Sequence, residues 1–253
     1  MDLREQKAKQ EGTTRHPWER ARRRVVLSLL DNTPPATRVL DVGCGDAFIL
    51  KGLAAHQADA AYTGVDQALD ASYTLEEGHH SIPIFANLDD VPSSKSKPLS
   101  HVLLLDVIEH IDDDVDFLRS LKRREDITRQ SLFLITVPAH PSLYTSHDKL
   151  LGHFRRYTKA SLRRTLDQAG MTIIHDGAFF SSLVGPRALE KTKELAFGSS
   201  RTHSGLSTWT RGSFVTSMIE TALVTDFKIG TVVQRSGLPF VGLSLYALCT
   251  PEL

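Results

Sequence analysis

Residues 39–50 read VLDVGCGDAFIL, and this stretch joins a short strand to a glycine loop and the start of a helix. The strand covers residues 38–42, and the helix is predicted over residues 47–56. Glycine lets a backbone turn sharply and approach a ligand closely. Because the N-terminus of a helix carries a positive partial charge, such a loop can hold a pyrophosphate or an amino-acid carboxylate.

The rest of the chain alternates between apolar strands and helices, which is typical of a parallel α/β sheet. The further predicted strands are residues 61–66, 82–86, 101–106, 131–137, 171–174 and 243–249, and further helices are predicted over 113–123 and 159–170. The sequence therefore predicts an α/β fold. Its sheet has seven strands, mostly parallel with one antiparallel strand near the C-terminal end, and helices cover both faces.

The 253-residue length suits one α/β domain, predicted over residues 15–253. Residues 1–14 are polar, so we expect them to be disordered. An amphipathic helix is predicted over residues 16–31. An insertion at 177–235, with helices at 187–197 and 214–224 and a flexible loop at 198–212, is expected to cover an acceptor site together with the N-terminal helix.

Composition narrows the classes of function. Lys+Arg and Asp+Glu number 30 each, which gives no basic footprint for nucleic acid. The local run from Arg15 to Arg24 is interpreted as the solvated face of a helix. Cys44 and Cys249 form no disulfide framework. No apolar run reaches the roughly 20 residues of a transmembrane helix, and no secretory signal is present, so a cytoplasmic protein is predicted.

The ligand of the glycine loop depends on its flanking residues. A dinucleotide fingerprint reads G-x-G-x-x-G/A, but Phe48 stands here at the position of the third glycine. Asp41, just before the loop, would repel a pyrophosphate but suits the ammonium group of methionine. Asp66 ends the second strand, where a carboxylate can accept hydrogen bonds from both ribose hydroxyls.

Three segments in this order, VLDVGCG, YTGVD and LLLDVIEH, resemble the class I S-adenosylmethionine (SAM) dependent methyltransferases over residues 38–175. This resemblance implies their Rossmann-like fold. The chain is also similar to the branch that includes the ubiquinone-biosynthesis O-methyltransferases. It is more similar still to bacterial methyltransferase-domain proteins that carry an H-x-W-x-R helix (His16, Trp18 and Arg20 here), a VPAHP…HD…GH-RRYT segment and a GLPFVGLSL-like closing strand.

The resemblance implies a SAM site. The methionine end would be lined by the loop, and Asp66 would bind the ribose with Gln67 beside it. Relatives often place glycine where this chain has Ala47, whose small side chain we expect to be tolerated. The complete set of predicted cofactor-binding residues is Asp41, Gly43, Cys44, Gly45, Asp66, Gln67, Asn87, Leu88, Leu105 and Asp106. Cys44 is interpreted as a packing residue rather than a nucleophile.

The segment Asp106-Val107-Ile108-Glu109-His110 has two readings. In the first, the segment binds a metal, because some ubiquinone enzymes bind a divalent ion through an acid-x-x-Glu-His segment. We favour the other, in which Glu109 and His110 orient the next helix and line the pocket without a metal.

Methyl transfer needs the nucleophile and the methyl group in line, and a hydroxyl or neutral amine acceptor must also lose a proton. Histidine suits this step near neutral pH. We rank His147 first as the base, then His110 and His140. The predicted substrate-binding residues are Trp18, Arg155, Arg156 and Tyr157; an arginine would bind an acidic acceptor, although Arg156 and Tyr157 could instead brace the loop against the sheet.

The sequence thus predicts a SAM-dependent methyltransferase acting on a small-molecule acceptor, with O- or N-methylation favoured. Two alternatives stay open: a nicotinamide dinucleotide-dependent oxidoreductase, and a non-catalytic protein that binds SAM. The insertion has three open roles, which are pairing of subunits in a homodimer, covering the pocket, and contact with a membrane surface.

Overall fold

The computed structural model describes residues 15–198 and 209–252. The expected disorder of residues 1–14, and most of the expected loop at 198–212, fall outside the described residues.

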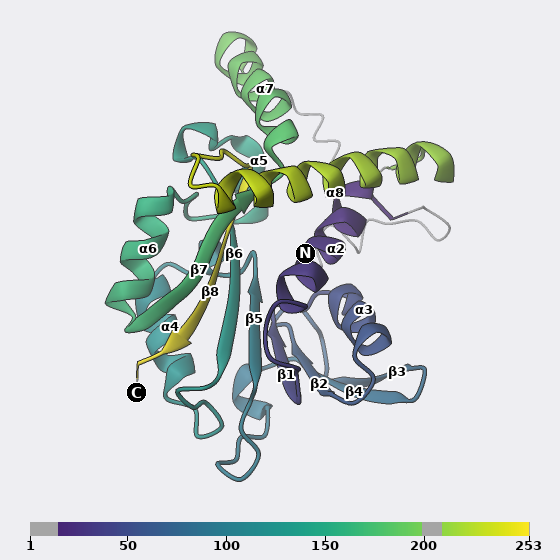
Figure 1. Cartoon of the computed structure of the whole chain (residues 1–253), viewed down its shortest axis with the longest axis vertical. Coiled ribbons are helices and arrows are strands. Elements are labelled where there is room, and N and C mark those ends of the chain that lie inside the picture. The colour runs from purple at the N-terminus through teal and green to yellow at the C-terminus, as the bar shows by residue number, and fades with distance from the viewer. Residues whose placement is uncertain (1–14, 199–208, 253) are drawn as a thin grey trace.

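A single twisted sheet of eight strands, in the order β3-β4-β2-β1-β5-β6-β8-β7, forms the centre of the molecule (Figure 1). Its strands are β1 (Arg38–Val42), β2 (Ala61–Val65), β3 (Tyr73–Glu77), β4 (His80–Phe85), β5 (His101–Leu105), β6 (Leu132–Pro138), β7 (Met171–Phe179) and β8 (Ser244–Pro251). The strands β4, β2, β1, β5 and β6 pair in parallel, whereas β8 runs antiparallel to β6 and β7. The predicted α/β fold is therefore confirmed.

The strand count differs from the prediction, because β3 adds an eighth strand, which is the second antiparallel strand of the sheet. Its sequence YTLEE is largely polar and exposed, since β3 lies at the edge of the sheet and pairs only with β4. A two-residue turn at Gly78, whose φ is +61°, joins the two strands. An edge hairpin of this kind carries none of the apolar signal by which buried strands are found.

Helices cover both faces of the sheet, and alternation along each strand explains why. In β5, Leu103 and Leu105 join one apolar cluster, while Val102 and Leu104 join the other. The first cluster includes α2 (Pro17–Leu30), α3 (Phe48–His56) and α8 (Ser213–Arg235), and the second includes α4 (Asp114–Lys122) and α6 (Lys159–Gln168). The short helix α5 (Ser146–Leu151) and the projecting helix α7 (Val184–Phe197) complete the set (Figure 1).

Helix α8 is about twice as long as the helix predicted at 214–224. Its second half contains Gly230 and several β-branched residues, which weaken helix propensity. Tertiary contacts hold this half in place: Gly230 packs closely under the ring of Phe240, and the Gln234 side chain hydrogen-bonds both the backbone N–H and the carbonyl of Ala178. Packing rather than local propensity therefore sets the length of the helix.

The arginine run on α2 is not a solvated face, so that expectation was wrong. Arg20 Nε and Arg24 Nε each form an ion pair with the buried Glu220 of α8, at 2.6 and 2.7 Å. The Arg23 guanidinium lies 4.2 Å from the ring centre of Phe48 on α3. These contacts fasten the N-terminal helix to its two neighbours.

Among the described residues, the helices are all too short or too polar to cross a lipid bilayer.

Candidate functional site

A cavity of about 770 Å³ opens at the carboxyl ends of the central strands. Gly43, Asp66 and Asp106 follow directly after β1, β2 and β5, and all three line the cavity. A smaller recess shares Trp18, Arg22 and Gly43 with the cavity and reaches in to Asp41, Cys44 and Leu105. This is the edge at which open α/β sheets bind their ligands.

The glycine loop is held in a single conformation that only glycine accepts. The backbone N–H groups of Gly43 and Cys44 both donate to the carbonyl of Val65, at 2.8 and 3.1 Å. Gly43 has a φ of +75°, and a Cβ there would lie 2.7 Å from Cγ2 of Val107. The absence of a side chain at Gly43 therefore allows the loop to pack directly against Val107, just after β5.

Ala47 occupies a position that favours glycine. Its φ is +59° at the N-cap of α3, in the left-handed region. A methyl group is the smallest side chain that an L-residue can bring there, so the strain is modest. The backbone conformation at Ala47 therefore favours glycine, and this chain accommodates alanine there.

Asp66 ties the glycine loop to the end of β2. Its Oδ2 accepts from the backbone N–H of Gly45 at 2.8 Å, and its Oδ1 accepts from that of Ala68 at 2.9 Å. Each carboxylate oxygen can accept a further hydrogen bond. Asp66 therefore lies fixed at the cavity wall with acceptor capacity left for a diol.

Asp41 is a buried acid without a partner for one of its oxygens. Its side chain is 1% exposed, and Oδ1 has no hydrogen-bond donor within the described residues. Burial, with a smaller contribution from the Asp66 charge, raises the pKa of Asp41 to about 7 against the opposing charge of Arg22. The recess beside it would suit a cationic group, which would stabilise the ionised form.

Arg22 connects α2 with the ends of β5 and β6. Its Nη2 lies 2.8 Å from Oδ2 of Asp106 and 3.1 Å from Oγ1 of Thr136, which itself donates to Oδ1 of Asp106. Arg22 is 5% exposed, and its Nε has no acceptor in the described part of the chain. A guanidinium at the wall of both the cavity and the recess offers this N–H to an anion.

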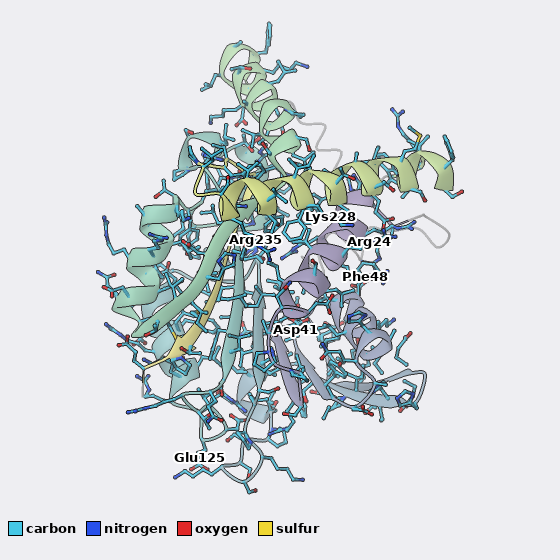
Figure 2. The ribbon with its side chains drawn as sticks, viewed as in Figure 1. Arg24, Asp41, Phe48, Glu125, Lys228 and Arg235 are labelled. Atoms are coloured by element: carbon cyan, nitrogen blue, oxygen red, sulfur yellow. The ribbon has the colours of Figure 1, made fainter. Side chains whose placement is uncertain are left out.

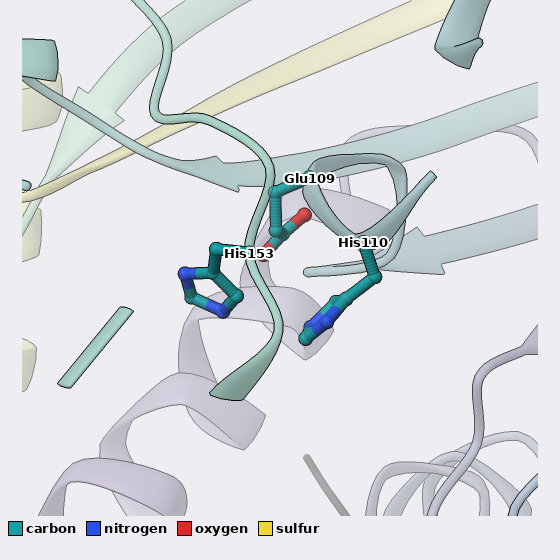
Figure 3. A group of neighbouring side chains, drawn as sticks. All are labelled: Glu109, His110 and His153. Atoms are coloured by element: carbon teal, nitrogen blue, oxygen red, sulfur yellow. The ribbon is translucent and has the colours of Figure 1, made fainter. Parts of the chain in front are cut away.

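Glu109, His110 and His153 bring three potential metal ligands within 4.8 Å of one another (Figure 3). Glu109 is fully buried, and neither of its carboxylate oxygens has a partner among the described residues. His153 Nδ1 lies 3.0 Å from Oδ1 of Asp148, which leaves Nε2 for another contact. Metal-binding histidines commonly have such a carboxylate on their second nitrogen.

This group fits a divalent ion, but not through the residues that the sequence pattern suggests. Asp106 is already paired with Arg22, so His153 takes its place beside Glu109 and His110. Two imidazoles and one carboxylate suit transition metals better than Mg²⁺. Without a cation, burial and the Asp106 charge raise the pKa of Glu109 well above its ordinary range.

Asp148 is the centre of a buried ionic cluster between α5, α7 and the loop before α6. Arg156 Nε donates to its Oδ1 at 2.8 Å, and Arg187 Nη2 donates to its Oδ2 at 2.7 Å. The backbone N–H of Thr145 adds a third donor at 2.9 Å. Although burial alone would raise its pKa, these donors and His153 hold the pKa of Asp148 far below the ordinary value.

Comparison with known proteins identifies the family. The family model described as "Methyltransferase domain" matches residues 14–176, which is more than half of the chain. This chain belongs to the methyltransferase-domain family. A search of curated proteins returns no match.

Solved structures agree on the fold of this methyltransferase. Coclaurine N-methyltransferase, bound to N-methylheliamine and S-adenosylhomocysteine, has a TM-score of 0.54 at 12% identity, over 96% of this chain and 73% of its own. The [4+2]-cyclase SpnF has a TM-score of 0.53 at 13% identity, over 96% and 85% of the two chains. The chain in complex with the Trm112 methyltransferase activator of Haloferax volcanii scores 0.51 at 15% identity, over 93% and 95%. At such identities the likeness concerns the fold alone.

The methyltransferase cavity brings together many of the residues that the sequence singled out. Those that line the cavity or the recess are Trp18, Asp41, Gly43, Cys44, Asp66, Gln67, Leu88, Leu105, Asp106, His110, His147 and Arg156. Burial, with the charges of Asp41 and Asp66, raises the pKa of Cys44. Its thiol therefore stays protonated, which agrees with a packing role.

Five of the predicted residues do not line either space: Gly45, Asn87, His140, Arg155 and Tyr157. Asn87 caps a short turn through the N–H of Asp89, and His140 Nε2 lies 3.0 Å from the carbonyl of Gly242. Tyr157 donates to Asp114 at 2.6 Å inside the core, and Arg155 donates to the carbonyl of Asp112 at 2.6 Å. Gly45 contributes through its backbone N–H, which donates to Asp66.

Arg156 lines the cavity, but its Nε donates to Asp148 and its Nη1 donates to the carbonyl of Ala139.

Sequence reasoning missed Arg22, Asp148, His153 and Arg187 as parts of the wall. Arg22 was hidden in an arginine run, although its position four residues after Trp18 places both on one side of the helix. For Arg187 no local signal exists, because its partner Asp148 lies 39 residues earlier.

We predict that Asp148→Asn lowers the free energy of unfolding at pH 7 by about 3 kcal/mol, because it leaves two buried arginines without their counter-charge. The pKa of Asp148 is lowered on folding, so its contribution is complete above its ordinary value of 3.8 and is lost as the pH falls below it. Urea unfolding monitored by circular dichroism gives the measurement. Asp167→Asn, at an exposed position on α6, is the control; an equal loss in both variants would contradict the cluster's role.

Proposed function

We propose that this protein is a SAM-dependent methyltransferase that transfers a methyl group to a hydroxyl or amine of a small-molecule acceptor. The observation that carries the proposal is the buried Asp41 carboxylate, whose unpartnered oxygen adjoins the recess beside the glycine loop. A dinucleotide would bring its pyrophosphate to this loop. A second negative charge is poorly accommodated beside a buried carboxylate.

SAM would lie across the recess and the adjoining end of the cavity. Its methionine ammonium would pair with Asp41, and its carboxylate would accept from the free N–H of Arg22. Its ribose diol would donate to Asp66, with the adenine beside Leu88 at the cavity wall. Each end of the cofactor thus meets a group of opposite charge or matching hydrogen-bonding capacity.

The remainder of the cavity would receive the acceptor under a cover of helices. Ile219 and Leu223 of α8, Leu183 and Arg187 contribute its wall. The insertion predicted at 177–235 would in this way act as the acceptor-site cover. The apolar residues that line the cavity here favour an acceptor with a substantial apolar part.

His147 is our candidate for the proton acceptor. It lines the cavity, and burial together with the nearby Arg187 charge lowers its pKa, against the opposing charges of Asp148 and Glu190. The imidazole is therefore neutral near pH 7 and able to take a proton. If a divalent ion occupies Glu109, His110 and His153, its chemistry would be to lower the pKa of an acceptor hydroxyl.

Calorimetric titration tests the cofactor assignment. We expect SAM and S-adenosylhomocysteine to bind at one molecule per chain, and NAD to give no heat. Asp66→Ala should weaken SAM binding at least about tenfold, because it removes charge-assisted hydrogen bonds to the ribose worth about 1.5–3 kcal/mol each. Asp59→Ala, at an exposed acid outside the site, serves as control. Binding of NAD in preference to SAM would refute the proposal in favour of an oxidoreductase.

The pKa of Asp41 predicts a pH dependence of SAM binding. The pKa of Asp41 is about 7 in the free protein, and the bound ammonium would lower it. SAM would therefore bind preferentially to the ionised form of Asp41. SAM affinity should therefore fall as the pH drops from 7.5 to 5.5, by up to about tenfold per unit. Asp41→Asn should bind weakly with little change over this range. A wild-type affinity that is constant between these pH values would contradict the pairing.

The role of His147 separates catalysis from binding. We expect His147→Gln to reduce transfer of a radiolabelled methyl group from SAM to acceptors in a cell extract by at least about a hundredfold. SAM affinity measured by calorimetry should stay unchanged in this variant. Transfer at the wild-type rate would exclude His147 as the base, and absence of transfer by the wild type with every extract would favour the non-catalytic alternative.

A further inference from the structure

Helix α8 has two apolar faces, only one of which is buried in the protein. Thr216, Leu223, Phe227 and Gly230 face inward. Away from this buried side, from its flank beside the cavity to its opposite side, the helix carries Phe214, Val215, Met218, Ile219, Ile229 and Val232, each 36–75% exposed. We call these six residues the outer face of α8. A helix that is apolar on both sides normally has both of them covered.

Exposed apolar groups are concentrated in this part of the molecule. Fifteen large apolar side chains are exposed among the described residues, and eleven of them lie between residues 184 and 241. Besides the outer face, they include Leu195 and Phe197 near the end of α7, which are 73% and 87% exposed. Figure 1 shows that α7 and α8 stand together at one end of the molecule, beyond the carboxyl edge of the sheet.

The exposed charges around the outer face are mainly positive. Each acid on α7 and α8 already has a partner within the protein. Glu190 forms an ion pair with Arg187, and Glu220 forms ion pairs with Arg20 and Arg24. Glu194 accepts a hydrogen bond from the N–H of Ser146, and Asp226 accepts hydrogen bonds from Ser182. The exposed basic residues of this region are Lys193, Arg211, Lys228 and Arg235. Lys228 and Arg235 extend from α8 (Figure 2). The surface therefore combines exposed apolar groups with an excess of positive charge.

That combination fits an anionic lipid surface better than a second copy of the chain. An interfacial helix places an apolar face among the acyl chains and its Lys and Arg residues at anionic headgroups. In a two-fold pairing of outer faces, both copies would bring the same excess of positive charge to the interface. The outer face also continues into the acceptor cavity, since Ile219 belongs to both.

We propose that the outer face of α8, with the end of α7, docks on the surface of an anionic lipid bilayer. The protein rests on the bilayer without crossing it, and the mouth of the cavity beside Ile219 faces the lipid. Docking is a property of the surface and holds whether or not the cavity binds SAM.

Vesicle co-sedimentation of the full chain tests this docking. Vesicles of phosphatidylcholine with phosphatidylglycerol should retain the protein, vesicles of phosphatidylcholine alone should retain much less, and added salt should weaken the binding. The double variant Phe214→Ser, Met218→Ser should bind anionic vesicles at least about tenfold more weakly. The double variant Lys228→Gln, Arg235→Gln should show a similar loss of binding to anionic vesicles and no change in binding to phosphatidylcholine vesicles.

Ile174→Ser is the matched control, because Ile174 is an equally exposed apolar residue on β7. It should bind vesicles as the wild type does. Thermal unfolding and SAM calorimetry on each variant show that fold and cofactor site are intact, and separate a failure of docking from a failure of the proposed function. Failure of the wild type to bind anionic vesicles overturns the proposal. The proposal is also overturned if light scattering without lipid shows a dimer of the wild type and a monomer of the Phe214/Met218 variant.

Discussion

Besides Asp66, four carboxylates lie buried or half-buried at one edge of the sheet, and the way their charges are compensated determines how the covering helices are attached. Asp106 is paired with Arg22 from the N-terminal helix, and Asp148 with Arg156 and with Arg187 from α7. A buried charge without a partner is costly. The two segments that cover the sheet edge are thus bound to it by the charges of the site itself.

The other two carboxyl groups, Asp41 and Glu109, have no such arginine partner. Both are fully buried with unpartnered oxygens within the described residues, and burial raises the pKa of each. Polar atoms left without partners in a folded core are uncommon and often mark sites of function. They are the two places at the site where an incoming cationic group would remove an electrostatic cost that folding leaves in place.

The fold could be predicted because its signals are local. The stretch at 39–50 and the apolar strands after it depend on spacing within a few residues, whereas the polar edge strand β3 has no such signal. The site was predictable only where residues follow a strand, as Asp66 and Asp106 do. Whether an arginine of α2 meets solvent, Glu220 or Asp106 depends on segments some 80 to 200 residues away, and no local pattern records such pairs.

The helices α7 and α8, which line part of the cavity, are also held by long-range contacts. Helix α8 is held by Glu220 to α2 near one end and by Gln234 to β7 near the other, and both α2 and β7 are fixed to the sheet. Helix α7 is held by Arg187 to Asp148, by Lys191 to the carbonyl of Tyr144 and by Glu194 to the N–H of Ser146, while its last residues, Leu195 and Phe197, stay exposed. Few internal contacts mean a low cost of local displacement. The end of α7 can therefore be displaced at a lower cost than α8, which is held at both Glu220 and Gln234.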